Sequence, residues 1–70
     1  MRINGPTLTV IRERSGLTQS DLARMTGVSQ GRISELESGE LNVRPATALA
    51  LSKALAVPVV TIIKDEASVA

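Results

Sequence analysis

The chain is 70 residues long, has a formal net charge of +1, and contains no cysteine, histidine or aromatic residue. A chain of this length makes one small domain. Without thiols or imidazoles it lacks disulfides, the usual nucleophile–base pairs and nearly all zinc ligand sets, so we expect no metal, no cofactor and no enzymatic activity. No apolar run approaches the roughly 20 residues that span a bilayer. We therefore expect a cytoplasmic domain without a membrane partner or a small-molecule ligand.

The first predicted helix follows the Gly5-Pro6 pair, which interrupts any earlier structure, and ends near Gly16. Four residues at helical spacing share one side of it: Leu8, Ile11, Arg12 and Ser15. This spacing predicts a helix with one side packed against a core.

Residues 17–39 predict two short helices joined by a tight turn. Thr18 is suited to cap the first of them, and Asp21, three residues later, completes an acidic variant of the capping box. Gly27 ends that helix, and Ser29 caps the next one, which runs to about residue 38 and is closed by a glycine. This arrangement is the one that presents a helix to the major groove of DNA.

A fourth helix is predicted to begin at Pro45, the position where proline is favoured. Its packed side is formed by five residues: Ala48, Leu49, Leu51, Ser52 and Leu55. Residues 57–63 are rich in β-branched side chains and favour a strand by propensity, whereas Pro58 could start a short fifth helix, so both remain open. We expect a compact all-α bundle of four to five helices, with the domain over residues 1–64 and a flexible polar tail over 65–70.

The helix that begins at Gln30 has a packed side and a polar side. Five residues on or beside the polar side are candidate base contacts: Gln30, Gly31, Arg32, Ser34 and Glu35. Gln30 can pair with adenine, Arg32 with guanine, and Glu35 can accept from cytosine. The same residue types are common on any solvated helix face, and Gly31 is explained either by close approach to DNA or as a tolerated glycine near a helix start.

Two charged residues fall on packed sides of their helices. Glu37 lies beside Ile33 on the third helix, and Arg12 lies beside Leu8 on the first. Because an unpaired buried carboxylate is driven toward its neutral form, we expect Arg12 and Glu37 to form a structural ion pair.

The run from residue 17 to 39 and the later run 51–57 resemble the Cro/C1-type helix-turn-helix family of phage and bacterial repressors. The matching positions are Thr18-Gln19, Leu22-Ala23, Gly27-Val28-Ser29, Ile33, Leu36-Glu37 and Gly39. The resemblance implies that the helix beginning at Gln30 is the recognition helix and that Gln19 contacts a DNA phosphate. The family also pairs a first-helix arginine with the glutamate that matches Glu37. The loop that follows departs from the family, because relatives often carry basic or small polar residues where this chain has Glu40, Leu41 and Val43.

Six residues are candidate contacts to the DNA backbone: Thr18, Gln19, Ser29, Ser38, Asn42 and Arg44. A helix N-terminus offers free N–H groups and a positive dipole end to an anionic oxygen, and Gln19 adds a side-chain donor. The near-neutral net charge argues against a broadly basic binder, but phosphate contacts need only a local face. For Arg44 the alternative is a merely solvated loop arginine.

Four apolar residues near the C-terminal end are candidates for a dimer interface: Val59, Val60, Ile62 and Ile63. The fourth helix cannot cover all of them in so small a domain, although the alternative is that they complete the monomer core. The resemblance implies a sequence-specific transcription regulator that binds palindromic operator DNA as a homodimer in a bacterial or phage-infected cell. The alternative function is an antitoxin that uses residues 59–69 to bind a partner protein.

Overall fold

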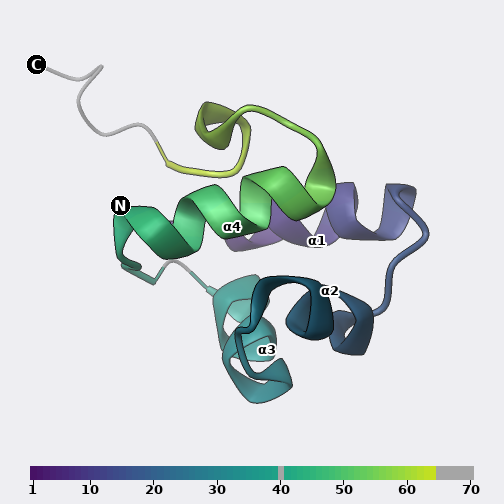
Figure 1. Ribbon diagram of the computed structural model, residues 1–70. Coiled ribbons are helices and arrows are strands. Elements are labelled where there is room, and N and C mark those ends of the chain that lie inside the picture. Colours follow the sequence, from purple (N-terminus) through teal and green to yellow (C-terminus); the bar gives the residue numbers. More distant parts are fainter. Residues whose placement is uncertain (40, 65–70) are drawn as a thin grey trace, which may run out of the picture.

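The computed structural model describes residues 1–39 and 41–64, and every regular element in these ranges is a helix. The predicted all-α class is confirmed, whereas the tail predicted for 65–70 lies outside the described residues. None of the helices in these ranges is long and apolar enough to cross a membrane. Figure 1 shows the elements in chain order: α1 (Gly5–Arg14), α2 (Gln19–Thr26), α3 (Gln30–Ser38), α4 (Pro45–Leu55) and the 3-10 turn η1 (Val59–Thr61).

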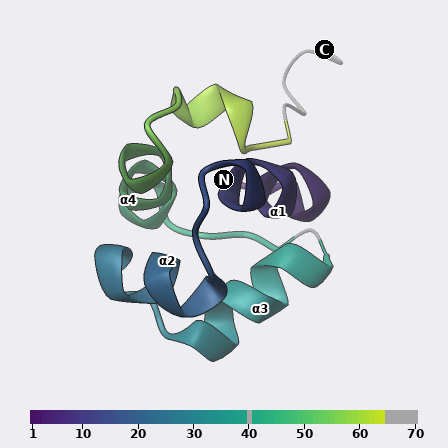
Figure 2. The same cartoon turned by 90° about the vertical axis from the view of Figure 1, so that its right-hand side faces the viewer.

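The helices form two layers around one core. Figure 2 shows α1 and α4 side by side in one layer, with α2 and α3 in the other, on the side of the molecule opposite η1. Helix α3 packs on both α1 and α2, and α4 packs on α2 and η1. The core between the layers is wholly aliphatic: Ile3, Leu8, Leu22, Ile33, Leu36, Ala48, Leu51, Leu55 and Ile62. Burial of these side chains is the main favourable term that holds the layers together.

Local hydrogen bonds set the ends of α2 and the start of α3. The Asp21 backbone N–H donates to the Thr18 hydroxyl at 2.9 Å, and the Thr18 backbone N–H donates to the Asp21 carboxylate at 2.9 Å. Gly27 then ends α2 in the left-handed region with φ 78°. The Ser29 hydroxyl accepts from the Arg32 backbone N–H at 3.2 Å and caps α3. Both helices therefore start at the residues predicted from their caps.

Gly5 is part of α1, where the sequence had indicated an interruption. The helix is capped one residue earlier, by the Asn4 side chain, which accepts from the Thr7 backbone N–H at 3.2 Å. A Cβ at Gly5 would lie 2.5 to 2.7 Å from three backbone carbonyl oxygens at the C-terminal end of α3. The start of α1 therefore contacts the α3 backbone directly, and only glycine permits this approach.

The extended N-terminal residues lie between two later segments of the chain. The Ile3 backbone N–H donates to the Leu41 carbonyl and the Asn4 N–H to the Ile62 carbonyl, both at 2.9 Å. Short antiparallel bridges thus join residues 2 and 3 to the α3–α4 loop on one side and to residue 63 on the other. The N-terminal segment connects that loop to the end of the domain.

Residues 57–63, for which the sequence allowed either a strand or a short helix, form neither of them over the whole segment. Pro58 precedes the single 3-10 turn η1, and only Ile63 enters a bridge. As a candidate dimer contact, Ile62 requires correction, because its side chain is 0% exposed and belongs to the monomer core. Val59 and Ile63 are partly buried against that core, and Val60 is 69% exposed. Ile62 is therefore part of the core and Val59 and Ile63 pack against it, while backbone hydrogen bonds join this end of the domain to the N-terminal segment.

Candidate nucleic-acid interface

The outward face of α3 is polar and exposed. Opposite the buried Ile33 and Leu36, five residues of the helix lie in solvent: Gln30, Gly31, Ser34, Glu35 and Ser38. They offer an amide, a carboxylate and two hydroxyl groups, which together supply the donors and acceptors that base edges recognise. Four of the five predicted base-contact residues therefore share one accessible surface.

Gly31 occupies open space on this face. A Cβ built there meets no atom within 4 Å. Packing within the described part of the domain therefore does not require glycine at this position, although glycine destabilises a helix interior by about 1 kcal/mol relative to alanine.

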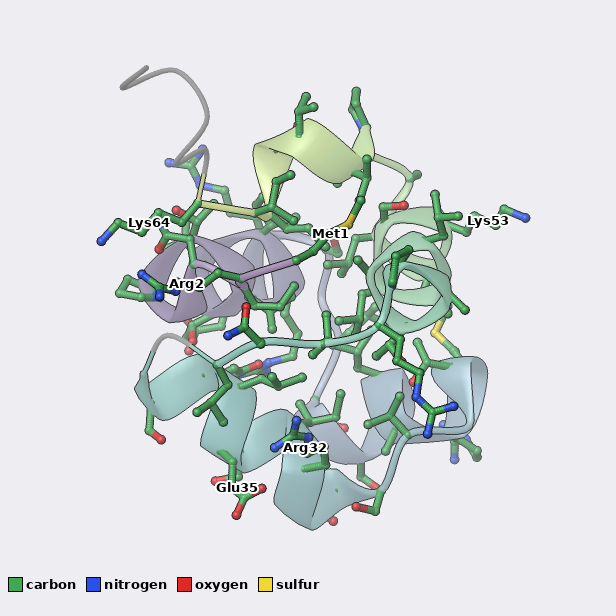
Figure 3. The ribbon with its side chains drawn as sticks, turned by 90° about the vertical axis from the view of Figure 1, so that its left-hand side faces the viewer. Met1, Arg2, Arg32, Glu35, Lys53 and Lys64 are labelled. Carbon is green, nitrogen blue, oxygen red and sulfur yellow. The ribbon has the colours of Figure 1, made fainter. Side chains whose placement is uncertain are left out.

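The Arg32 side chain points in a different direction from the side chains of the other base-contact candidates. Its guanidinium donates to the Asn42 backbone carbonyl at 3.3 Å and lies 3.4 Å from the Glu35 carboxylate, and 42% of the side chain is exposed. In Figure 3, Glu35 points away from the molecule while Arg32 lies across α3 toward the α3–α4 loop. The guanidinium is therefore beside the outward face rather than on it.

An open groove of about 540 Å³ runs between α3 and the start of α4. Its lining combines apolar, neutral polar and cationic side chains: Val28, Arg32, Asn42, Val43, Arg44 and Thr47. Two of the eight Lys and Arg residues of the chain thus line one surface feature next to the α3 face. This is a local basic surface on a molecule whose net charge is only +1.

The hydroxyl residues among the predicted backbone contacts also serve the helices. Thr18 and Ser29 accept from backbone N–H groups as N-caps, and Ser38 donates to the Glu35 carbonyl at 3.0 Å. A hydroxyl that accepts one hydrogen bond keeps its O–H to donate. Thr18 and Ser29 are exposed and so retain a donor for an anionic oxygen, and Asn42 and Arg44 are exposed in the loop before α4.

Arg12 and Glu37, which the sequence pattern led us to expect as a pair, are joined by two hydrogen bonds. Arg12 Nε donates to Glu37 Oε2 at 2.5 Å, and Nη2 donates to Oε1 at 3.1 Å. The third guanidinium nitrogen donates to the Leu17 carbonyl at 2.7 Å. Only 11% of the Arg12 side chain and 6% of the Glu37 side chain are exposed. This arginine therefore ties α1, the turn before α2, and α3 together.

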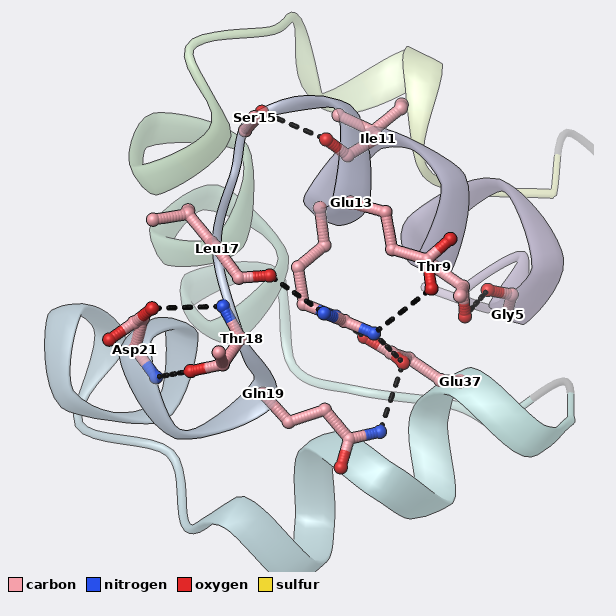
Figure 4. Close-up of polar contacts among 11 residues, drawn as sticks. Gly5, Thr9, Ile11, Glu13, Ser15, Leu17, Thr18, Gln19, Asp21 and Glu37 are labelled. Carbon is pink, nitrogen blue, oxygen red and sulfur yellow. Dashed lines mark hydrogen bonds and ion pairs between the residues drawn. The ribbon is translucent and has the colours of Figure 1, made fainter.

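Gln19 joins the same network, which the sequence did not indicate. Its side-chain amide donates to Glu37 Oε1 at 3.0 Å (Figure 4). The first residue of α2 is thereby attached to the last turn of α3. The Gln19 amide keeps a second N–H, so the bond to Glu37 orients the donor that the family resemblance assigns to a phosphate. A residue spacing of 18 carries no periodic signal that would have revealed this contact.

The network sets the charge states of its members. Burial by itself would raise the pKa of the Glu37 carboxyl, but hydrogen bonds from Arg12 and Gln19 and the charge of Arg12 outweigh it, so that this pKa lies below its ordinary value. The hydrogen bond to Glu37 is also the largest influence that raises the pKa of Arg12. Both groups are therefore charged at neutral pH.

No cluster of three or more metal-ligating His, Cys, Asp or Glu side chains occurs in the described ranges. Figure 2 shows α2 and α3 packed together on one side of the molecule, and the basic groove adjoins α3 through Arg32.

Comparison with known proteins identifies this arrangement. The helix-turn-helix family profile matches residues 10–62. The restriction-modification controller protein C.AhdI from Aeromonas hydrophila is 30% identical, with a TM-score of 0.76 over 81% of this chain and 86% of that one. The N-terminal DNA-binding domain of the biofilm regulator SinR from Bacillus subtilis is 26% identical, with a TM-score of 0.75 over 89% and 91% of the two chains.

The same fold also occurs inside a larger protein. A variant of hydroxyethylphosphonate dioxygenase is 26% identical with a TM-score of 0.81, and the similarity covers 94% of this chain but 14% of the dioxygenase. No curated protein sequence matches the chain significantly. The family profile and the two regulator structures support a DNA-binding transcription regulator. The chain belongs to the XRE-type helix-turn-helix family.

Proposed function

We propose that this protein regulates transcription by binding a specific palindromic operator as a homodimer. The observation that carries the proposal is the exposed polar face of α3, which is bordered on one side by the N-terminus of α2 and on the other by the α3–α4 loop. A helix held in this way enters the major groove with its N-terminal residues nearest the bases.

Base recognition is assigned to the outward face of α3. Gln30 presents an amide that can pair with adenine N6 and N7, and Glu35 presents a carboxylate that can accept from cytosine N4. Ser34 adds a hydroxyl that can either donate to a base or accept from one. Gly31 leaves space for a base edge or a thymine methyl group to approach the helix, which offsets its cost to α3.

Phosphate contacts are assigned to the borders of that face. Thr18 and Gln19 at the start of α2, and Ser29 at the start of α3, combine side-chain donors with the positive ends of two helices. Ser38, Asn42 and Arg44 complete the set on and after α3. These contacts fix the position of the protein on the duplex, and the α3 face supplies the sequence preference.

Dimerisation is assigned to the apolar surface near the end of the domain. With Ile62 in the core, the exposed part of this surface is Val60, with Val59 and Ile63 at its edge. A two-fold pair of domains would present its α3 helices to half-sites roughly 34–36 Å apart, one turn of DNA. Repression then follows when the dimer occupies a promoter and excludes the polymerase.

The test is selective recovery of DNA by the purified chain from fragmented genomic DNA at physiological salt. We expect enrichment of a short palindrome that competes with random DNA by roughly 1,000-fold or more in a gel shift. A folded chain that enriches no sequence would contradict the proposal and favour a protein partner instead.

A further inference from the structure

We infer that the groove between α3 and the start of α4 holds a phosphodiester of the DNA backbone, and that Arg32 is one of its ligands rather than a reader of bases. The inference rests on the proposed DNA binding and changes the role of one predicted base-contact residue. It is carried by the direction of the Arg32 side chain and by the composition of the groove.

The direction of Arg32 follows from its place on the helix. It precedes the buried Ile33 by one residue and Leu36 by four, so it flanks the packed side of α3. From there the guanidinium reaches the Asn42 carbonyl at 3.3 Å, across the space between helix and loop. To meet a base in front of the outward face it would have to leave this carbonyl and turn around the helix.

The groove has the chemistry that a sugar–phosphate unit requires. Arg32 and Arg44 supply two guanidinium groups, which match phosphate oxygens in geometry as well as in charge. The Thr47 hydroxyl and the Asn42 amide are neutral donors in the same lining, and Val28 and Val43 offer apolar surface to a deoxyribose. At 42% exposure Arg32 is accessible from solvent.

Glu35 is the carboxylate that competes for Arg32. Its Oε1 lies 3.4 Å from Arg32 Nη1, which is long for a charge-assisted hydrogen bond, and 64% of its side chain is exposed. A phosphate can therefore replace this contact at small cost. The exchange releases Glu35 to accept from a base.

The groove also lies where a second DNA strand is expected. At 100° per residue, Arg32 and Glu37 are about 140° apart around α3. Glu37 holds Gln19 at the start of α2, so the two proposed phosphate sites flank the outward face on opposite sides. A helix in the major groove, which is about 12 Å wide, has a phosphate strand on each side in the same way.

The first experiment measures operator and random-DNA affinity over a salt series for the native chain, Arg32→Ala and Arg32→Lys. For Arg32→Ala we expect the slope of log K against log salt to fall by about one, with the same fold-loss on both DNAs. Arg32→Lys should keep the slope, because a phosphate accepts any cation whereas bidentate guanine recognition needs the arginine fork.

The control is Lys53→Ala, which removes the same charge from the exposed side of α4, far from Arg32 in Figure 3, and should leave the slope unchanged. Circular dichroism checks that each variant is folded. An unchanged slope for Arg32→Ala, with a discrimination loss of roughly tenfold or more at one base pair, would overturn the inference and restore Arg32 as a base reader.

A second experiment tests the same contact by changing the DNA. It uses operators in which one phosphate at a time is replaced by a neutral methylphosphonate. We expect one backbone position in each half-site where the substitution weakens the native chain but not Arg32→Ala. If every substitution affects the two proteins equally, no phosphate is held by Arg32. A native chain that binds no DNA would instead overturn the proposed function together with this inference.

Discussion

At the residue scale, the buried Arg12–Glu37 pair joins α1 to α3. Arg12→Ala leaves the Glu37 carboxylate almost fully buried without its cation, so we expect a loss of about 3–5 kcal/mol in the free energy of unfolding. Urea denaturation measures this loss in the free energy of unfolding. The matched control is Arg14→Ala, an exposed arginine of the same helix, which should change stability by about 0.5 kcal/mol or less. Equal effects of the two substitutions would contradict a structural role for the pair.

The lowered pKa of Glu37 also predicts a dependence on pH. Because the unfolded chain binds this proton more readily than the folded one, the contribution of Glu37 is complete above its ordinary pKa and is lost as the pH falls through the lowered folded value. Asp21 acts in the same direction, since the hydrogen bond from the Thr18 backbone N–H lowers its pKa. We expect Glu37→Gln to make the free energy of unfolding depend less steeply on pH between about pH 5 and pH 2. Part of the dependence should remain, because Asp21 still titrates. Thermal unfolding across this range checks the result.

At the scale of elements, the contact between α1 and α3 depends on one glycine. Gly5→Ala places a methyl group against backbone carbonyls that cannot rotate away, so α1 must shift and we expect a loss of about 1–3 kcal/mol. Gly31→Ala is the matched control within α3. Its Cβ meets open space, so the same substitution should stabilise the domain by up to about 1 kcal/mol. Two gains of similar size in chemical denaturation would show that helix propensity, and not this contact, decides the outcome.

At the scale of the whole molecule, substitutions at Val60 and Ile62 distinguish an effect on dimer assembly from an effect on folding. Val60→Asp changes an exposed side chain, so we expect weaker self-association and weaker operator binding with little change in the unfolding temperature of the monomer. Ile62→Ala should instead destabilise the monomer by about 2–5 kcal/mol, because it empties part of the core. Sedimentation and thermal unfolding, measured on the same samples, distinguish the two effects. A Val60→Asp chain that associates like the native one would remove Val60 from the dimer surface.

The sequence by itself determined both ends of α2 and the start of α3. The residues that set these ends act through hydrogen bonds or backbone angles within one helical turn: Thr18, Asp21, Gly27 and Ser29. Contacts of such short range can be predicted because the residues that make them are close together in the sequence. The outward face of α3 followed from its period alone. The pairing of Arg12 with Glu37 followed as well, since each charge stood on a packed side.

Only the tertiary structure decided the other contacts between separate segments of the chain. Four features require separate segments to meet in space. They are the approach of Gly5 to the α3 backbone, the bond from Gln19 to Glu37, the direction of Arg32 toward Asn42 and the burial of Ile62 in the core. A period places a residue on a face, but it does not say which neighbour covers that face or which way a long side chain turns at its edge. Packing of the two layers decides both the covering neighbour and the direction of the side chain. Two side chains cannot occupy the same interior space, and each buried polar group needs a hydrogen-bond partner.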